Sequence, residues 1–145
     1  MKKLPPIEKI YEAYTAIADG RIEIDLQEQS ATMTSSTGLK SYTVQWKDNV
    51  YSSTDNATYW QGYPGYPIIA VLMLQGKIPL DEGIAQLFAG VPWFELNKKY
   101  KRDYAQAVAS VIKERGLDSE SIQAAVDEAY EALTQLDITV KRSIK

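Results

Sequence analysis

Residues 50–75 read VYSSTDNATYWQGYPGYPIIAVLMLQ, and this stretch decides how the chain folds. Its first four residues, 50–53, predict a short strand. Residues 54–66 are rich in Gly, Pro, Asn and aromatic side chains, which indicates a loop. Pro67 suits the first turn of a helix and Gly76 suits its end, while the residues between them are apolar on every side. We expect this helix to be buried all round and to lie across a sheet.

Upstream of this stretch, the spacing of apolar residues changes from helical to alternating. The helical face comes first and consists of Ile7, Ile10, Tyr11, Tyr14, Ile17 and Ala18. Gly20 suits the end of that helix. Alternating apolar residues then predict three strands, around residues 22–26, 31–33 and 42–46. With the strand at 50–53 they form a four-stranded antiparallel meander that can bury one face against a helix.

Downstream of the apolar helix, the pattern is helical again. Residues 80–88 predict a short helix, and two longer apolar stripes span residues 93–111 and 122–136. The Gly-Leu-Asp-Ser turn at 116–119 separates these stripes, so they predict a helical hairpin. Residues 138–144 alternate weakly and fit either a last strand or a frayed tail. The sequence therefore predicts an α+β fold: an N-terminal helix, a four-stranded antiparallel meander, a buried central helix and a C-terminal helical hairpin.

Composition narrows the class of protein. A chain of 145 residues fits one domain, or one domain with an appended helical piece. It has no Cys and no His, which excludes thiolate nucleophiles, disulfides, imidazole bases and nearly every zinc or copper site. The net charge of −3 gives no general affinity for phosphate backbones. The longest apolar run, residues 68–74, is far shorter than the ~20 residues of a membrane span. We expect a cytoplasmic protein with no membrane segment and no cofactor.

The order of helix, strands, turn-rich loop and apolar helix resembles a SWIM zinc-finger domain. That family has the pattern C-x-C, a variable gap, and then C-x-H running into an apolar helix. Tyr51 and Ser53 stand at the first two ligand positions, and Gly65 and Pro67 stand at the last two. The resemblance marks residues 1–78 as a degenerate SWIM-like region. Residues 79–145 are then a helical region packed on it, within one structural unit.

The resemblance implies a module that binds DNA or protein, here without its metal. Structural zinc contributes about 10 kcal/mol or more to closing a small finger. A well-buried aromatic side chain contributes roughly 3 kcal/mol, so several together reach a similar scale. We therefore predict metal-free folding in which rings join the last strand to the helix: Tyr51, Tyr59, Trp60, Tyr63 and Tyr66.

The same aromatic loop is the first candidate binding site. Tyr and Trp offer rigid, amphipathic contact area and dominate binding hot spots, whereas packing in the core is the alternative role for these rings. Both roles can hold together, with some rings facing inward and others outward. The candidate binding residues are Tyr59, Trp60, Tyr63 and Tyr66. We expect a non-catalytic interaction module that binds another protein or a second copy of itself.

Two further sites compete with this hypothesis. The basic cluster Lys98, Lys99, Lys101 and Arg102 could bind nucleic acid, although a solvated helix face is the favoured interpretation. Asp55, among hydroxyl side chains, could serve a hydrolase or hold a cation, although turn formation and capping explain it too. Nucleic-acid binding is the alternative function, and we expect the chain not to be an enzyme.

Overall fold

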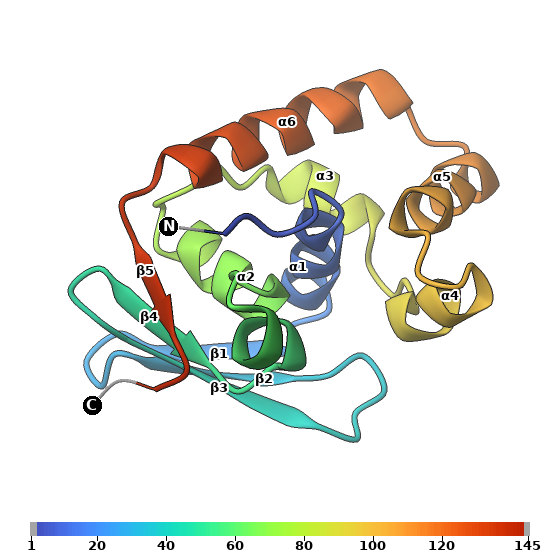
Figure 1. The fold of residues 1–145 in the computed structure, drawn as a ribbon. Helices are drawn as coiled ribbons and strands as arrows, with labels where there is room; N and C mark the ends of the chain where they lie inside the picture. The colour runs from blue at the N-terminus through green and yellow to red at the C-terminus, as the bar shows by residue number, and fades with distance from the viewer. Residues whose placement is uncertain (1–2, 144–145) are drawn as a thin grey trace.

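Helices cover one face of a five-stranded sheet in the computed structural model, which describes residues 3–143 (Figure 1). The α+β class that the sequence predicts is confirmed. The strands lie in the order β1-β2-β3-β4-β5, and the first four form an antiparallel meander. Their bounds are Ile22–Asp25 (β1), Ser30–Thr34 (β2), Ser41–Lys47 (β3), Val50–Ser53 (β4) and Thr139–Lys141 (β5).

Alternation along the strands sets which face is buried. In β2 and β3, Ala31, Met33, Val44 and Trp46 are buried while their neighbours are exposed. Ala31 lies opposite Val44, so the buried positions of adjacent strands share one face. The predicted first strand is one residue too long, because β1 ends at Asp25 and the Leu26 side chain is 67% exposed.

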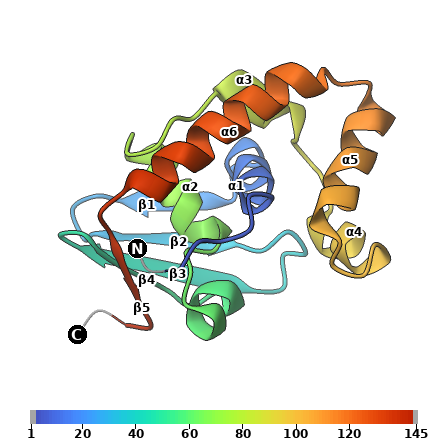
Figure 2. The same ribbon diagram turned by 45° about the horizontal axis from the view of Figure 1, so that its top comes forward.

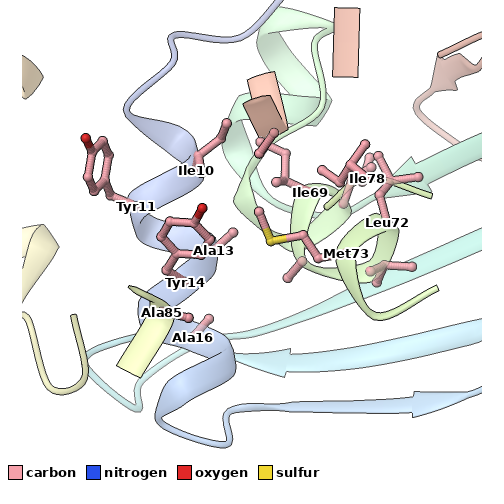
Figure 3. Packing of buried hydrophobic residues seen from close by; sticks show 14 of the residues in the cluster. Ile10, Tyr11, Ala13, Tyr14, Ala16, Ile69, Leu72, Met73, Ile78 and Ala85 are labelled. Atoms are coloured by element: carbon pink, nitrogen blue, oxygen red, sulfur yellow. The ribbon is translucent and has the colours of Figure 1, made fainter. Parts of the chain in front are cut away.

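The core lies between α1 (Lys9–Ala18), α2 (Tyr66–Leu74) and the sheet (Figure 3). Every residue from Pro67 to Met73 in α2 is buried, as its uniformly apolar sequence predicts. Ile10 from α1 and Ile69 from α2 point into the same cluster. Burying each such side chain contributes about 1.5–3 kcal/mol, so these two helices fix the centre of the molecule.

Helices make up most of the C-terminal region, and the first helix of the predicted hairpin, over residues 93–111, is divided into two. The bounds are α3 Glu82–Leu87, α4 Trp93–Lys99, α5 Tyr104–Arg115 and α6 Ser119–Gln135. Lys101 and Arg102 have φ values of 53° and 67°, so the chain turns there. Asp103 then caps α5 by accepting a hydrogen bond from the Gln106 N–H at 3.1 Å. As a result α4 and α5 stand beside the sheet, while α6 passes over α1 (Figure 2).

The end of the chain returns to the sheet as β5. This strand pairs parallel to β4, with Thr139 opposite Val50 and Val140 opposite Tyr51. The open choice between a strand and a tail for residues 138–144 is thus resolved as a strand over its central part, and residue 144 lies outside the described residues. Residues 79–145 are therefore not wholly helical, and the sheet has five strands where the sequence predicts four. The buried core includes Ile69 and Val126, from both sides of residue 79.

Candidate functional site

A cleft of about 550 Å³ opens between the sheet, α1 and the pair α4–α5. Five cationic side chains from separate segments line it: Lys9, Arg21, Lys40, Lys98 and Arg102. Glu12 is the one carboxylate among the described residues that line it. Aromatic and apolar side chains form much of the remaining wall: Leu39, Tyr42, Tyr66, Trp93, Phe94 and Tyr104. The cleft is therefore strongly basic in a chain whose net charge is −3.

A buried hydrogen-bond chain fixes the two helical walls of the cleft relative to each other. Thr15 on α1 donates its hydroxyl to the Phe88 carbonyl oxygen at 2.7 Å and accepts from Trp93 Nε1 at 2.8 Å. Thr15 is fully buried and Trp93 is only 4% exposed. Because Trp93 begins α4, this contact ties α4 to α1 without water between them.

Lys9 and Glu12 form an ion pair inside the cleft. Lys9 Nζ lies 3.0 Å from a Glu12 carboxylate oxygen, and both side chains are 13% exposed. Burial raises the pKa of Glu12 above that of an ordinary carboxyl, Lys9 opposes the rise, and the charge of Asp55 adds to it. Burial alone would lower the pKa of Lys9, but the charge of Glu12 and the hydrogen bond to it outweigh burial and raise that pKa. Glu12 is thus a carboxyl that gains a proton more readily than most.

Arg21 and two tyrosines form another part of the wall. Arg21 donates from Nη1 to the Thr34 carbonyl oxygen at 2.7 Å, and its Nε lies 3.6 Å from an Asp19 carboxylate oxygen. The Tyr42 and Tyr66 rings meet edge to face at 6.4 Å. Burial, helped by Tyr42, raises the pKa of Tyr66 to about 12, while Arg21 opposes the rise. Tyr66 therefore presents a neutral hydroxyl near a cation at physiological pH.

The predicted basic cluster is split by the turn at residues 101–102. Lys98 and Arg102 line the cleft, whereas Lys99 and Lys101 do not. The Lys99 ammonium lies over the Tyr100 ring, 5.4 Å from its centre, and Lys101 is exposed. The four residues thus do not form a single basic stripe.

The sequence did not single out the cations on the opposite wall of the cleft. Lys9, Arg21 and Lys40 are far from residue 98 in the sequence, and each has an ordinary local context. Tertiary folding alone brings them together with Lys98 and Arg102, so no motif or spacing in the chain signals the site.

The four candidate rings of the loop are also divided. Tyr59 and Trp60 are 37% and 66% exposed and contact each other edge to face at 4.8 Å. The Arg142 guanidinium lies 4.8 Å from the Tyr59 ring centre and 5.5 Å from that of Trp60. Tyr66 lines the cleft instead, and the half-buried Tyr63 lies under the Lys3 ammonium at 5.6 Å. The loop therefore presents an exposed pair rather than a patch of four rings.

The four positions that correspond to metal ligands in the resemblance are all buried: Tyr51, Ser53, Gly65 and Pro67. Only one of these positions carries a ring that joins strand to helix. The Tyr51 hydroxyl donates to Gln75 Oε1 at 2.7 Å and accepts from Lys77 Nζ at 2.9 Å. Tyr59 and Trp60 are exposed whereas Tyr51 is buried, so the rings of this stretch divide between inward and outward positions and do not all close the connection.

Polar contacts close the connection between β4 and α2. This connection contains a single turn of π-helix, η1 (Ala57–Gln61). The Asp55 carboxylate accepts from the Thr58 N–H at 3.1 Å, and the Thr58 hydroxyl accepts from the Gly65 N–H at 3.0 Å. Asp55 is 4% exposed and is not among the residues that line the cleft. Its capping contacts match the structural role that the sequence offered as the alternative to chemistry.

A sequence profile of the family described as "Uncharacterised conserved protein UCP014422" matches residues 2–139. The chain belongs to this family. Every residue that lines the cleft lies within the matched range, so the cleft is built from the part of the chain that the family profile covers. No curated protein and no solved structure matches the chain.

In the range 3–143, no three acidic side chains come together as ligands for a metal ion. No helix in the same range combines the length and the apolar character that crossing a membrane requires.

Proposed function

We propose that the protein is a non-catalytic binding module and that its cleft holds a small organic anion. The convergence of five cationic side chains on one cleft supports this proposal, because Glu12 is the one carboxylate among the described lining residues and Asp19 pairs with Arg21 from outside the lining. The volume of about 550 Å³ lies within the ~300–1,000 Å³ of ordinary small-molecule sites. The apolar walls at Leu39 and Phe94 suit a ligand that has an apolar body as well as a charge.

The division of the basic cluster favours a small ligand over a nucleic-acid strand. A protein that follows a phosphate backbone needs cations spaced along a surface groove. Here Lys98 and Arg102 turn into the cleft while Lys99 and Lys101 stay outside it. The positive charge is therefore gathered at one place rather than extended along a track.

Paired charge reversals test the proposal with a matched control. The double variant K98E/R102E changes two side chains that line the cleft, and K99E/K101E makes the same change in charge outside it. We expect the first variant to bind the fluorescent probe anilinonaphthalene sulfonate about tenfold or more weakly than the wild type, which corresponds to about 1.4 kcal/mol. The second variant should stay within about twofold of the wild type, because Lys99 and Lys101 lie outside the cleft and solvent and salt screen their charges from a ligand bound there.

Fluorescence titration at fixed ionic strength measures these affinities, and circular dichroism checks that each variant is folded. Equal weakening by both variants would mean a general charge effect and would exclude the cleft as the site. The same pair of variants tests the nucleic-acid alternative with a single-stranded oligonucleotide. Backbone binding predicts that both variants weaken it and that affinity falls steeply with salt.

A protein partner at Tyr59 and Trp60 is a second candidate function. The observation that favours it is the 66% exposure of the Trp60 ring, which contacts the Tyr59 ring and the Arg142 guanidinium. Large exposed rings of this kind are common hot spots. A sedimentation experiment on the wild type and W60A tests for self-association through this pair, and an identical monomer–dimer balance in both would count against it.

A further inference from the structure

Glu12 lies among the cations that would hold a bound anion. Its carboxylate is 3.0 Å from Lys9 Nζ, and both side chains line the cleft with only 13% exposure. Arg21 lines the same cleft and acts on Glu12 by its charge. An anion that is bound by Lys9 and Arg21 therefore comes to rest beside a carboxylate.

Two negative charges at such short range, in a largely buried position, do not both stay ionised easily. One way to remove the conflict is for Glu12 to take a proton from solvent. The protonated carboxyl then has an O–H that can donate a hydrogen bond to the anion, and Lys9 is released from its ion pair. The cleft gains one donor and loses the negative charge of Glu12, the one carboxylate among its described lining residues, in the same step.

The surroundings of Glu12 already favour protonation of its carboxylate. Burial and the charge of Asp55, on the β4–α2 connection, raise the pKa of Glu12, while Lys9 and Arg21 lower it. Tyr42, Tyr63 and Tyr66 also face this group, since the charge of Glu12 contributes to the raised pKa of each. An incoming anion counteracts the two cations, which are the groups that keep Glu12 ionised.

We propose that the cleft takes up a small organic monoanion, such as a carboxylate or sulfonate with an apolar body, together with one proton. Lys9 and Arg21 hold the anion, and Glu12 holds the proton, which comes from solvent. This inference rests on the proposed function, because it requires that the cleft bind an anion at all.

Titration calorimetry with anilinonaphthalene sulfonate tests the coupling, because the sulfonate stays ionised and any proton taken up must go to the protein. Binding is measured in pairs of buffers that differ in ionisation enthalpy, between about pH 5 and pH 9. We expect uptake of up to one proton per probe. The affinity should fall by up to about tenfold per pH unit once Glu12 is ionised in the free protein. E12Q should bind the probe without proton uptake, while E95Q, on the exposed face of α4, should behave as the wild type.

Binding without proton uptake anywhere in this range would overturn the inference and leave the proposed function standing. Uptake that persists in E12Q would also overturn it, because another group would then take the proton. Absence of binding, or equal binding by K98E/R102E, would instead overturn the proposed function. If E12Q does not fold, carbon NMR of wild-type protein labelled at its glutamate carboxyls decides the question. One signal must move to the protonated position when the probe saturates the site.

Discussion

The connection between β4 and α2 and the wall of the cleft are both rich in polar side chains, but they use them differently. In the connection, Asp55, Thr58 and Gly65 come from one short stretch and bond mainly to one another. In the cleft, Lys98 and Arg102 face open space from α4 and the turn behind it. Polar groups that bond to one another hold a fold together, whereas charges that face a cleft, such as those of Lys98 and Arg102, are available to a ligand.

The largest expected effect is at Gly65, where the connection is tightest. A Cβ atom at this position would lie 2.1 Å from Asp55 Oδ2, and Asp55 could move away only by losing the hydrogen bond that this oxygen accepts from the Thr58 N–H. We expect G65A to lose about 3 kcal/mol of unfolding free energy, as measured by urea titration.

G83A is the matched control, because its Cβ would meet nothing closer than 3.4 Å and the position is inside α3. There alanine should be neutral or stabilising by up to about 1 kcal/mol. If G65A were as stable as the wild type, the polar connection would have room for a larger side chain, and the contrast with the cleft would weaken.

The next largest effect is expected at Thr15, which ties together the walls of the cleft. T15V keeps the shape of the side chain but leaves Trp93 Nε1 and the Phe88 carbonyl without the partner they share. We expect a loss of about 2 kcal/mol in unfolding free energy. T134V, which removes an exposed hydroxyl bond on α6, should change stability by less than about 0.5 kcal/mol. Equal effects from the two variants would mean that the buried bond does not hold the walls.

Stability at alkaline pH should depend on Tyr66 more than on a tyrosine with an unperturbed pKa. The pKa of this tyrosine is about 12 in the folded protein against 10.0 for an unperturbed tyrosine. The unfolded chain therefore ionises first, so stability is complete below pH 10 and falls as the pH rises toward 12. Thermal melting across this range should show the fall, and Y66F should show a smaller one. A Y66F curve parallel to the wild type would place the effect on other tyrosines.

The smallest effect on stability is expected at Trp60. Its ring is 66% exposed, so W60A should change the unfolding free energy by less than about 0.5 kcal/mol and leave probe binding in the cleft unaltered. A loss above about 2 kcal/mol in urea unfolding would show that the ring supports the connection after all.

Local patterns in the sequence predict most of the elements. The apolar run in α2 predicts its complete burial, and alternation predicts the four meander strands. The break at residues 100–103 escapes prediction because Lys101 and Arg102 adopt positive φ without any glycine to mark the turn. The parallel pairing of β5 with β4 also escapes it, because that pairing depends on where the preceding helices return the chain.

The two candidate sites also differ in whether the local sequence predicts them. The exposed pair Tyr59 and Trp60 is visible in the sequence, because the two rings are neighbours in one loop. The cleft is not, because Lys9, Arg21 and Lys98 meet only after three distant segments have packed. A SWIM-like origin for residues 1–78 stays a prediction. Polar contacts and the Tyr51 hydroxyl hold the strand-to-helix connection.

The parallel docking of β5 has a consequence for the newly made chain. The ribosome synthesises this strand after every other strand, so the outer edge of β4 stays open until η1, the five helices α2–α6 and β5 have been made. An open strand edge can pair with the same edge of another nascent chain. Expression of polypeptides that stop before Thr139 should therefore yield aggregates, even though the meander and its two covering helices are already complete.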